Sequence, residues 1–446
     1  MKSKPILIIM IAFLFGKTKA QDQQNTSSFT LQQAIDYAYK NSPNYLNAQN
    51  DVLMAKYKRK EVIGIAMPQI SGSVDMKNFL ELPTQLIPAE FFGGKPGTFA
   101  PLKFGTTFQT TAGLNASLLV FSADYLVGLK ATKEMIGLMS INVGRSKTET
   151  VSGVSKAYYG VLVNRERIKL LDANITKLSK LLNDTKAFNQ QGFVEQIDVD
   201  RLEVAYNNLI TEKQKVENLI NLSQNVLKFQ MGYAGKESLS LSDSLIVTDR
   251  TEVDASKIEY AKRPEYQMLE YQQKLYNINV KRLKLGYLPT LVAYGSYSYA
   301  GYGNNLSYVE DTRTWFPTKV IGATLSLSIF DGLQRHYKIQ QAKLDFTKGE
   351  LSMKNLQLAI ELESASAAVN YNNAVASLQT QKRNMELAQN IYNVSQKKYE
   401  QGVGTNLEVI NAQASLKESE TNYFNAVYDM LIYKTDYLKA TGTLVK

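Results

Sequence analysis

The chain contains no cysteine, a single histidine (His336) and a single tryptophan among its 446 residues. The absence of cysteine excludes disulfide bonds, a thiolate metal site and a lipid anchor built on a cysteine. No P-loop, GxSxG sequence or cluster of metal-ligating residues is present in the sequence. We therefore expect no enzyme activity, no catalytic residue, no metal and no cofactor.

Long apolar runs are also absent, apart from one near the start. The segment MKSKPILIIMIAFLFGKTKA places two lysines before an apolar stretch from Ile6 to Phe15 and ends in Ala20. This stretch is about half as long as the roughly 20 residues that a membrane-spanning helix needs. We interpret residues 1–20 as a cleavable signal peptide, so that the chain is exported. No later run reaches spanning length, which argues against a helical membrane protein.

The charge balance gives little reason to expect a nucleic-acid partner. The net charge of +10 falls to +6 when the four lysines of the signal peptide are removed, because that segment holds no acidic residue. An apolar fraction of 44% is typical of an ordered protein rather than of a disordered one.

Proline is scarce, and the ten prolines leave residues 102–263 and 318–446 without one. Because proline breaks helix interiors and central strands, both spans are free to form regular structure. Short sequences also recur along the chain: NSPNY returns as KRPEY, and QGFVEQIDVDRLE returns as QGVGTNLEVINAQ. These correspondences predict two copies of one structural unit, residues 21–253 and 254–446.

Each unit is predicted to contain a helix, a pair of strands, a long helix and a shorter returning helix. Thr30 and Gln33 fit a capping box that begins the first helix, and the second unit's first helix is expected from about Asp254 to Gly286. The proline-rich residues 81–101 read as a long surface loop. Strand pairs are expected within 67–121 and 288–330, long helices at 122–190 and 333–400, and returning helices at 196–231 and 407–441.

The strands alternate with the period of two that a half-buried strand requires. The residues predicted to share a face are Leu114, Ala116, Leu118 and Val120, and in the second unit Ile321, Ala323, Leu325, Leu327 and Ile329. These strands fit a soluble hairpin, in which tyrosine is simply a good strand former. They fit a membrane hairpin equally, with an aromatic belt of Tyr294, Tyr297, Tyr299 and Tyr302.

The helices favour the membrane interpretation. A helix of 68 residues is about 100 Å long, and the returning helix is about half as long. Leu202, Leu209 and Val216 lie seven apart, and Ala205, Leu219 and Val226 form a second row three residues further on that Glu212 interrupts, which is a coiled-coil pattern. Four strands cannot close a barrel, since about eight are needed, and an open sheet would leave unpaired edges in lipid. Three chains would supply twelve strands, so we predict a trimer; a soluble coiled-coil rod or adhesin is the alternative.

The sequence resembles the TolC-like outer membrane efflux protein family. The resemblance covers the mature chain and is carried by the repeat, SIFDG at 328–332, YEQGVGTNLEVINAQ at 399–413 and LKATG at 438–442. It implies a mixed α and β outer membrane protein with four membrane strands per chain, a twelve-stranded barrel in the trimer, and coiled-coil helices that form a periplasmic α-barrel.

The resemblance also implies a function. Family members are exit ducts of tripartite efflux pumps or of type I protein secretion systems. The expected surroundings are the outer membrane of a Gram-negative bacterium and its lipid, a periplasmic adaptor protein and an inner-membrane transporter. Twelve methionines are scattered along the chain, and packing in a helical core explains them better than a soft-metal cargo.

Residues at the two helix turns receive roles by the same resemblance. Glu408 and Asn411 match two acidic pore positions, so three copies of Glu408 would form a cation-favouring ring that Asn411 weakens. Asp198 and Tyr399 match a pair that closes the turns, and Gly404 stands where the family has a supporting arginine. Arg201, Lys397 or Lys398 could replace that arginine. The expected adaptor contacts are Gly192, Phe193, Gly402, Val403, Gly404 and Thr405.

A simpler explanation exists for the same residues. Acidic side chains such as Asp198 and Glu408 are favoured in the first turn of any helix by the helix dipole. The glycines form turns under either interpretation.

Overall fold

The computed structural model describes residues 27–235, 237–245, 253–254 and 258–445. The predicted signal peptide lies outside the described residues. Most of the described chain is helical. The α-helices are α1 (Leu31–Asn41), α2 (Pro43–Ile65), α3 (Ala123–Gln190), α4 (Gln196–Met231), α5 (Pro264–Leu285), α6 (Gln334–Glu400) and α7 (Asn406–Ala440).

Local sequence explains where the first helices begin and end. The Thr30 hydroxyl accepts from the Gln33 N–H, and the Gln33 side chain accepts from the Thr30 N–H, so the predicted capping box is present. Pro43 begins α2 directly after the extended residue Ser42. Proline has no N–H to contribute to a preceding helical turn, so α1 ends before Pro43 and α2 begins with it.

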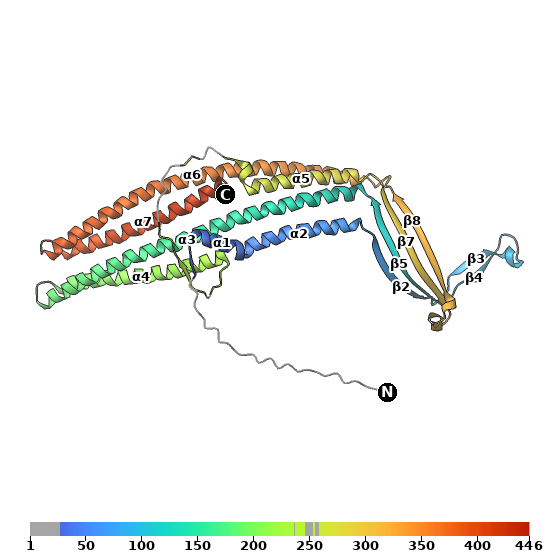
Figure 1. Ribbon diagram of the computed structural model, residues 1–446, viewed down its shortest axis with the longest axis horizontal. Coiled ribbons are helices and arrows are strands. Elements are labelled where there is room, and N and C mark those ends of the chain that lie inside the picture. The colour runs from blue at the N-terminus through green and yellow to red at the C-terminus, as the bar shows by residue number, and fades with distance from the viewer. Residues whose placement is uncertain (1–26, 236, 246–252, 255–257, 446) are drawn as a thin grey trace, which may run out of the picture. The chain divides into compact units, whose positions relative to one another are not determined.

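The strands form one sheet of four and two small pairs. The larger sheet has the order β2 (Gln69–Asn78), β5 (Phe108–Phe121), β7 (Thr290–Gly303) and β8 (Trp315–Ser326), with every neighbouring pair antiparallel. Figure 1 shows the four strands side by side, with α2, α3, α5 and α6 all joining the sheet at the same end. The small pairs are β1 (Ser27–Phe29) with β6 (Leu239–Leu241) and β3 (Thr84–Pro88) with β4 (Phe99–Lys103).

The pairing register gives the sheet two chemically different faces. Residues opposite one another in a ladder point to the same side. One face is mostly apolar and carries Ile70, Val74, Leu114, Ala116, Leu118, Ile321, Ala323 and Leu325. The other carries Ser71, Ser73, Asp75, Gln109, Thr111, Asn115, Ser117, Ser296, Ser298 and Thr318. The sheet is therefore amphipathic across its full width.

Three sequence expectations were wrong in detail. β8 ends at Ser326, so Leu327 and Ile329 lie beyond the strand, and Leu333 soon follows with a left-handed φ of 65°. α5 begins at Pro264 rather than near Asp254, because that proline starts the helix after the short 3₁₀ turn Tyr260–Lys262. The expected surface loop 81–101 forms most of the β3–β4 hairpin, in which five residue pairs form. Pro88 and Pro101 are tolerated there because both strands of a two-stranded pair are edge strands.

The described residues divide into two compact units, which differ from the two repeats predicted from the sequence. One is made from residues within Met1–Ser42, Val154–Thr248 and Met385–Phe424, and the other from Pro43–Gly153, Asp249–Asn384 and Asn425–Lys446. The larger sheet and the β3–β4 hairpin belong to the second unit, and the two helix turns belong to the first. Among the described helices, none is both long and apolar enough to cross a bilayer.

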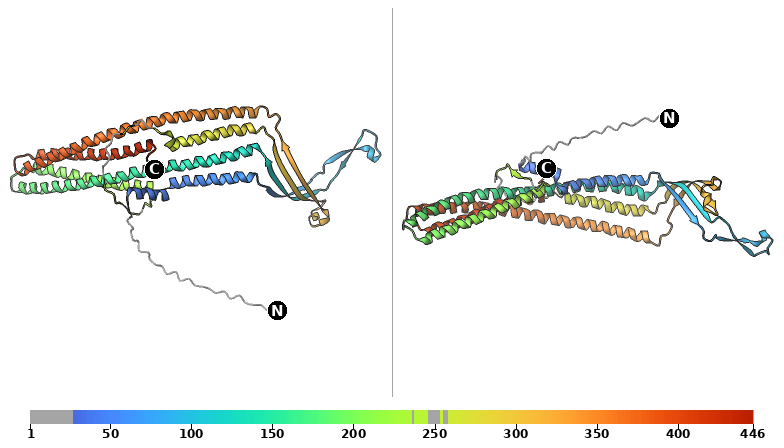
Figure 2. Two further views of the ribbon diagram at one scale, coloured as in Figure 1. Left: turned by 45° about the horizontal axis from the view of Figure 1, so that its top comes forward. Right: turned by 90° about the horizontal axis from the view of Figure 1, so that it is seen from below.

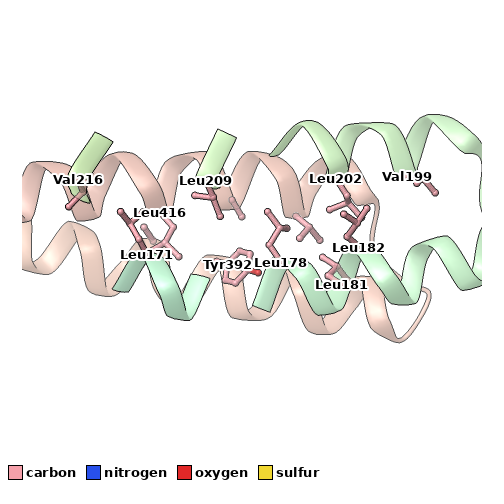
Figure 3. Packing of buried hydrophobic residues seen from close by; sticks show 13 residues of the cluster. Leu171, Leu178, Leu181, Leu182, Val199, Leu202, Leu209, Val216, Tyr392 and Leu416 are labelled. Carbon is pink, nitrogen blue, oxygen red and sulfur yellow. The ribbon is translucent and has the colours of Figure 1, made fainter. Parts of the chain in front are cut away.

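The core of the first unit is a continuous row of leucine and valine side chains between α3, α4, α6 and α7. Leu202, Leu209 and Val216, which the heptad pattern singled out, are all almost fully buried there (Figure 3). Leu178 and Leu416 reach the same row from α3 and α7. The helices therefore pack in pairs by interdigitating side chains, as in a coiled coil.

A clamp holds the start of the described chain to the first unit. The Tyr158 hydroxyl lies 2.9 Å from the carbonyl oxygen of Phe29 and 2.8 Å from the Asp243 carboxylate, which also accepts from the Leu31 N–H. Burial, followed by the bond to Asp243, raises the pKa of Tyr158 well above its usual range, so the hydroxyl keeps its proton. Arg165 donates to the carbonyl oxygen of Leu241 and fixes β6 beside β1.

Candidate functional site

Two glycine turns join the long helices to the returning ones, and they close in the same way. In each turn the N–H groups of the glycine and of the next residue donate back to the preceding helix. The pairs are Gly192 to Asn189, Phe193 to Phe188, Gly402 to Tyr399 and Val403 to Lys398, at 2.9–3.0 Å. Gly192 has a φ of 82° and Gly402 a φ of 76°, a conformation that side chains disfavour. The sequence repeat is thus a repeat of helix-ending geometry.

Each turn exposes one apolar side chain to solvent. Phe193 is 74% exposed and Val403 is 75% exposed. Gly404 is needed for a different reason from Gly402, because a Cβ there would lie 2.8 Å from the Cβ of Lys398. Thr405 caps α7, since its hydroxyl accepts from the Glu408 N–H at 3.3 Å. Both exposed side chains lie on hydrogen-bonded turns and are accessible to another protein.

Polar contacts connect the bases of the two turns. The Asn406 side chain donates to the carbonyl oxygen of Asp198 at 2.6 Å, so the first residue of α7 is tied to the first turn of α4. The Asp198 carboxylate lies 3.7 Å from the guanidinium of Arg201 on the same helix. The Tyr399 hydroxyl lies 3.3 Å from that of Thr185, and not against Asp198. Within one chain, then, Asp198 and Tyr399 do not bond to each other.

Arg201 is the basic residue that the structure brings to Asp198. Lys397 and Lys398, the other two candidates, are exposed residues of the last turn of α6. Lysines in a last helical turn interact favourably with the negative end of the helix dipole. Of the three, only Arg201 forms a described ion pair with Asp198.

Glu408 and Asn411 lie on one face of α7 because they are three residues apart. Both are exposed, whereas their neighbours Val409 and Ala412 are buried in the core of the first unit. α7 therefore presents a polar stripe on its outer side. This exposure leaves both side chains available to a solvent-filled space.

A groove of about 1260 Å³ separates the two turns. It is lined by Phe188, Phe193, Asp198, Arg201, Tyr399, Thr405 and Asn406, among others. Both views of Figure 2 show the turns side by side at the end of their helices. Most of the residues predicted for the turns therefore border one groove.

Two groups at this site escaped sequence reasoning. Asn406 directly precedes the apolar pattern of α7, which suggests a helix cap rather than a contact with the other turn. Thr185 lies inside α3, where a lone threonine has no distinguishing pattern. Their partners, Asp198 and Tyr399, are both more than two hundred residues away, so only the tertiary fold could reveal these contacts.

The tyrosines predicted as one aromatic belt lie on two faces of the sheet, which corrects that expectation. Tyr297 and Tyr299 share the apolar face, where their hydroxyls are 2.7 Å apart and the Lys319 ammonium lies 5.0 Å from the Tyr297 ring. Tyr294 and Tyr302 share the polar face. Successive strand residues alternate sides, so 294 and 302 cannot point the same way as 297 and 299.

Comparisons with known proteins agree with this architecture. Residues 258–443 match the family model described as outer membrane efflux protein. The chain is 21% identical over 343 residues to the outer membrane protein TolC of Salmonella enteritidis, covering 75% of this chain and 70% of that protein. It is also 21% identical over 349 residues to the toluene efflux pump outer membrane protein TtgC of Pseudomonas putida, covering 76% of this chain and 70% of that protein.

The fold is also found among solved structures. The Campylobacter jejuni CmeC outer membrane channel superimposes with a TM-score of 0.73 at 16% sequence identity, covering 99% of this chain and 95% of that one. The family match, the relatives along most of the chain and the shared fold point the same way. Residues 258–443 thus match the outer membrane efflux protein family, and the chain as a whole is similar to TolC-like proteins in sequence and fold.

Proposed function

We propose that this chain is the outer membrane exit duct of a tripartite efflux pump. The observation that carries the proposal is the amphipathic sheet joined at one end to long helices. One face of the sheet suits lipid and the other suits a water-filled passage. Family members act in pumps, and the named relative TtgC belongs to a toluene efflux pump.

The duct is a homotrimer that spans the outer membrane of a Gram-negative bacterium. A four-stranded sheet has two free edges, β2 and β8, which lipid cannot satisfy. Closure by three chains gives a twelve-stranded barrel, above the practical minimum of about eight strands. Tyr297 and Tyr299 are the belt residues that face the lipid, while Tyr294 and Tyr302 face the passage. The chain performs no catalysis and carries no cofactor.

Two structural repeats build each chain, at residues 21–253 and 254–446, after a signal peptide at 1–20. The order helix, strand, strand, long helix, returning helix occurs first as α2, β2, β5, α3, α4 and then as α5, β7, β8, α6, α7. This order supports the repeat that the recurring short sequences suggested. A soluble rod has no need of an amphipathic sheet in each copy.

The glycine turns form the periplasmic end of the duct and its gate. Glu408 supplies a ring of three carboxylates that attracts cations, and the neutral Asn411 weakens the ring. Asp198, held by Arg201, and Tyr399 keep the turns together in the closed state. A periplasmic adaptor, which connects the duct to an inner-membrane transporter, contacts Gly192, Phe193, Gly402, Val403, Gly404 and Thr405.

Single-channel conductance in a planar bilayer tests this proposal. We expect the wild-type protein to form a small, cation-selective channel. Glu408→Gln reduces the preference for cations because it removes the ring charge, whereas Glu408→Asp keeps it. Arg201→Ala raises the conductance because it loosens Asp198, whereas the matched control Lys397→Ala leaves it unchanged. Folded, membrane-inserted protein that conducts no ions would overturn the duct and favour the structural rod.

A further inference from the structure

Residues 79–107 form an ordered extension between β2 and β5 that the duct function does not explain. The Phe79 N–H donates to the carbonyl oxygen of Thr107 at 2.8 Å and closes the base of the extension. β3 and β4 pair above it, and Lys103 bonds Glu81 at 2.8 Å. Figures 1 and 2 show the hairpin leaving the end of the strands that is remote from α2 and α3. Its tip is also hydrogen-bonded, because the Gly97 N–H donates to the Glu90 carboxylate at 3.1 Å.

The hairpin exposes an unusual amount of apolar surface. Leu80 is 96% exposed and Phe91 79% exposed, and Leu86, Phe92 and Phe99 are each more than half exposed. The main contacts of β3 and β4 are with each other. A two-stranded hairpin alone is marginally stable in water, and apolar patches of this kind mark binding surfaces. Something outside the single chain therefore covers it.

The strand order indicates where that cover lies. β2 and β8 are the two edges of the sheet and run in opposite directions, since each of the three ladders is antiparallel. Closure of the sheet by a second copy therefore pairs β2 with an antiparallel β8. The end of β2, where the hairpin begins, then lies beside the start of β8 in the next copy.

The start of β8 carries an apolar loop that matches the hairpin. Tyr308 is buried between the rings of Phe108 and Trp315, and its hydroxyl bonds that of Thr110. These contacts fix the 3₁₀ turn Leu306–Val309. Leu306 is 58% exposed and Val309 is 51% exposed, so the fixed turn presents an unpaired apolar surface.

We infer that the hairpin of residues 79–107 is a contact arm that packs on the Leu306–Val309 turn of a neighbouring copy of this chain. The inference rests on the proposed closure of the barrel by several copies. It assigns residues 79–107 to holding adjacent copies together beyond the end of the barrel. Burial of apolar surface on both partners supplies the stabilisation.

Cysteine cross-linking tests the contact directly, because the chain has no native cysteine. The variant Leu80→Cys with Val309→Cys is expected to give covalent dimers and trimers on a non-reducing gel. The matched control, Leu80→Cys with Leu327→Cys, uses an exposed leucine just beyond the opposite end of β8 and is expected to remain uncoupled. Protein with the native mass of three chains that yields no cross-link at Val309 overturns the inference while the trimer stands. A native mass of one chain overturns both.

A second variant measures what the arm contributes. Replacing residues 80–106 by Asn-Gly joins Phe79 to Thr107 through a two-residue hairpin turn. We expect this variant to insert and to conduct, but its trimers should dissociate in detergent at a lower temperature than wild-type trimers. An unchanged dissociation temperature would contradict the contact arm. Quenching by brominated lipid of a dye on Phe91→Cys would also contradict it, because the hairpin would then lie in the bilayer.

Discussion

At the scale of single residues, polar side chains inside the first compact unit connect different helices. Glu212, which interrupts the heptad pattern of α4, bonds Arg167 of α3 at 2.6 Å and lies 4.0 Å from Lys417 of α7. Glu420 of α7 is buried, and both of its oxygens accept from the Asn174 side chain of α3 at 2.8–3.0 Å. These groups fix the register between helices, because a shift of one helix along another would leave them unpaired.

Glu420 makes the stability of this unit depend on pH. Burial raises the pKa of Glu420 above its usual 4.5, while the Asn174 bond and nearby Lys177 oppose that rise. The folded state therefore holds its proton to a higher pH than the unfolded chain, and stability is lost as pH rises from the ordinary pKa through the raised one. We expect Glu420→Gln to be more stable than wild type at neutral pH, with the difference vanishing below pH 4.5.

Urea denaturation followed by circular dichroism over a pH series measures this difference. Glu418→Gln is the matched control, since it makes the same substitution at an exposed position of the same helix and removes no buried carboxylate. Equal stability of Glu420→Gln and wild type at every pH would show that Asn174 and Lys177 fully compensate for burial.

At the scale of elements, the larger sheet carries two surfaces on one set of strands. β8 alternates an apolar series, Ile321, Ala323 and Leu325, with a series that contains Thr318, Gly322 and Thr324. The ladders extend this alternation across β5 and β7 with one irregularity, near Leu119. If the apolar face contacts lipid, adjacent residues of one strand therefore face lipid and water alternately.

Lysine scanning of adjacent positions tests that assignment. Ala323→Lys places a charge on the apolar face and should reduce folding into liposomes, at a cost of up to about 4 kcal/mol near the bilayer centre. Thr324→Lys, one residue further on, places the same charge on the polar face and should be nearly neutral. The measurement is the folded fraction of each variant in lipid vesicles across a urea series. Equal losses for both variants would contradict a lipid-facing side.

At the scale of the whole molecule, one chain is incomplete by its own geometry. β2 and β8 each leave one row of backbone hydrogen-bonding groups unpaired within the four-stranded sheet. The apolar face adds exposed side chains such as Ile70, Ile321 and Leu325. In the proposed duct, other copies of the chain pair with the two free edges, and lipid contacts the apolar face.

Stability should therefore depend on the concentration of chains. If folding and assembly are linked, the midpoint of reversible unfolding in lipid rises with protein concentration by mass action. Measuring the midpoint over a wide dilution series, with native mass determined in parallel, checks this expectation. A constant midpoint together with the mass of one chain would show that the folded unit is a monomer.

The sequence by itself predicted the order of the long helices, the four strands of the larger sheet and both glycine turns. These features follow from local rules: proline punctuation, the capping box at Thr30, apolar periods of two and seven, and glycine at positive φ. The resemblance to the efflux family rested on the same local segments. Even the two-sided placement of the tyrosines could have been read from the parity of residues 294, 297, 299 and 302.

Only the tertiary structure decided which distant residues meet. The bond from Asn406 to Asp198, the choice of Arg201 as the partner of Asp198, and the pairing of Glu420 with Asn174 have no local signal. The structure also turned an expected loop into the β3–β4 hairpin, because pairing Leu86 with Pro101 requires two segments to meet across a tip. Local propensities act within a few residues along the chain, whereas these contacts depend on how whole helices and strands pack.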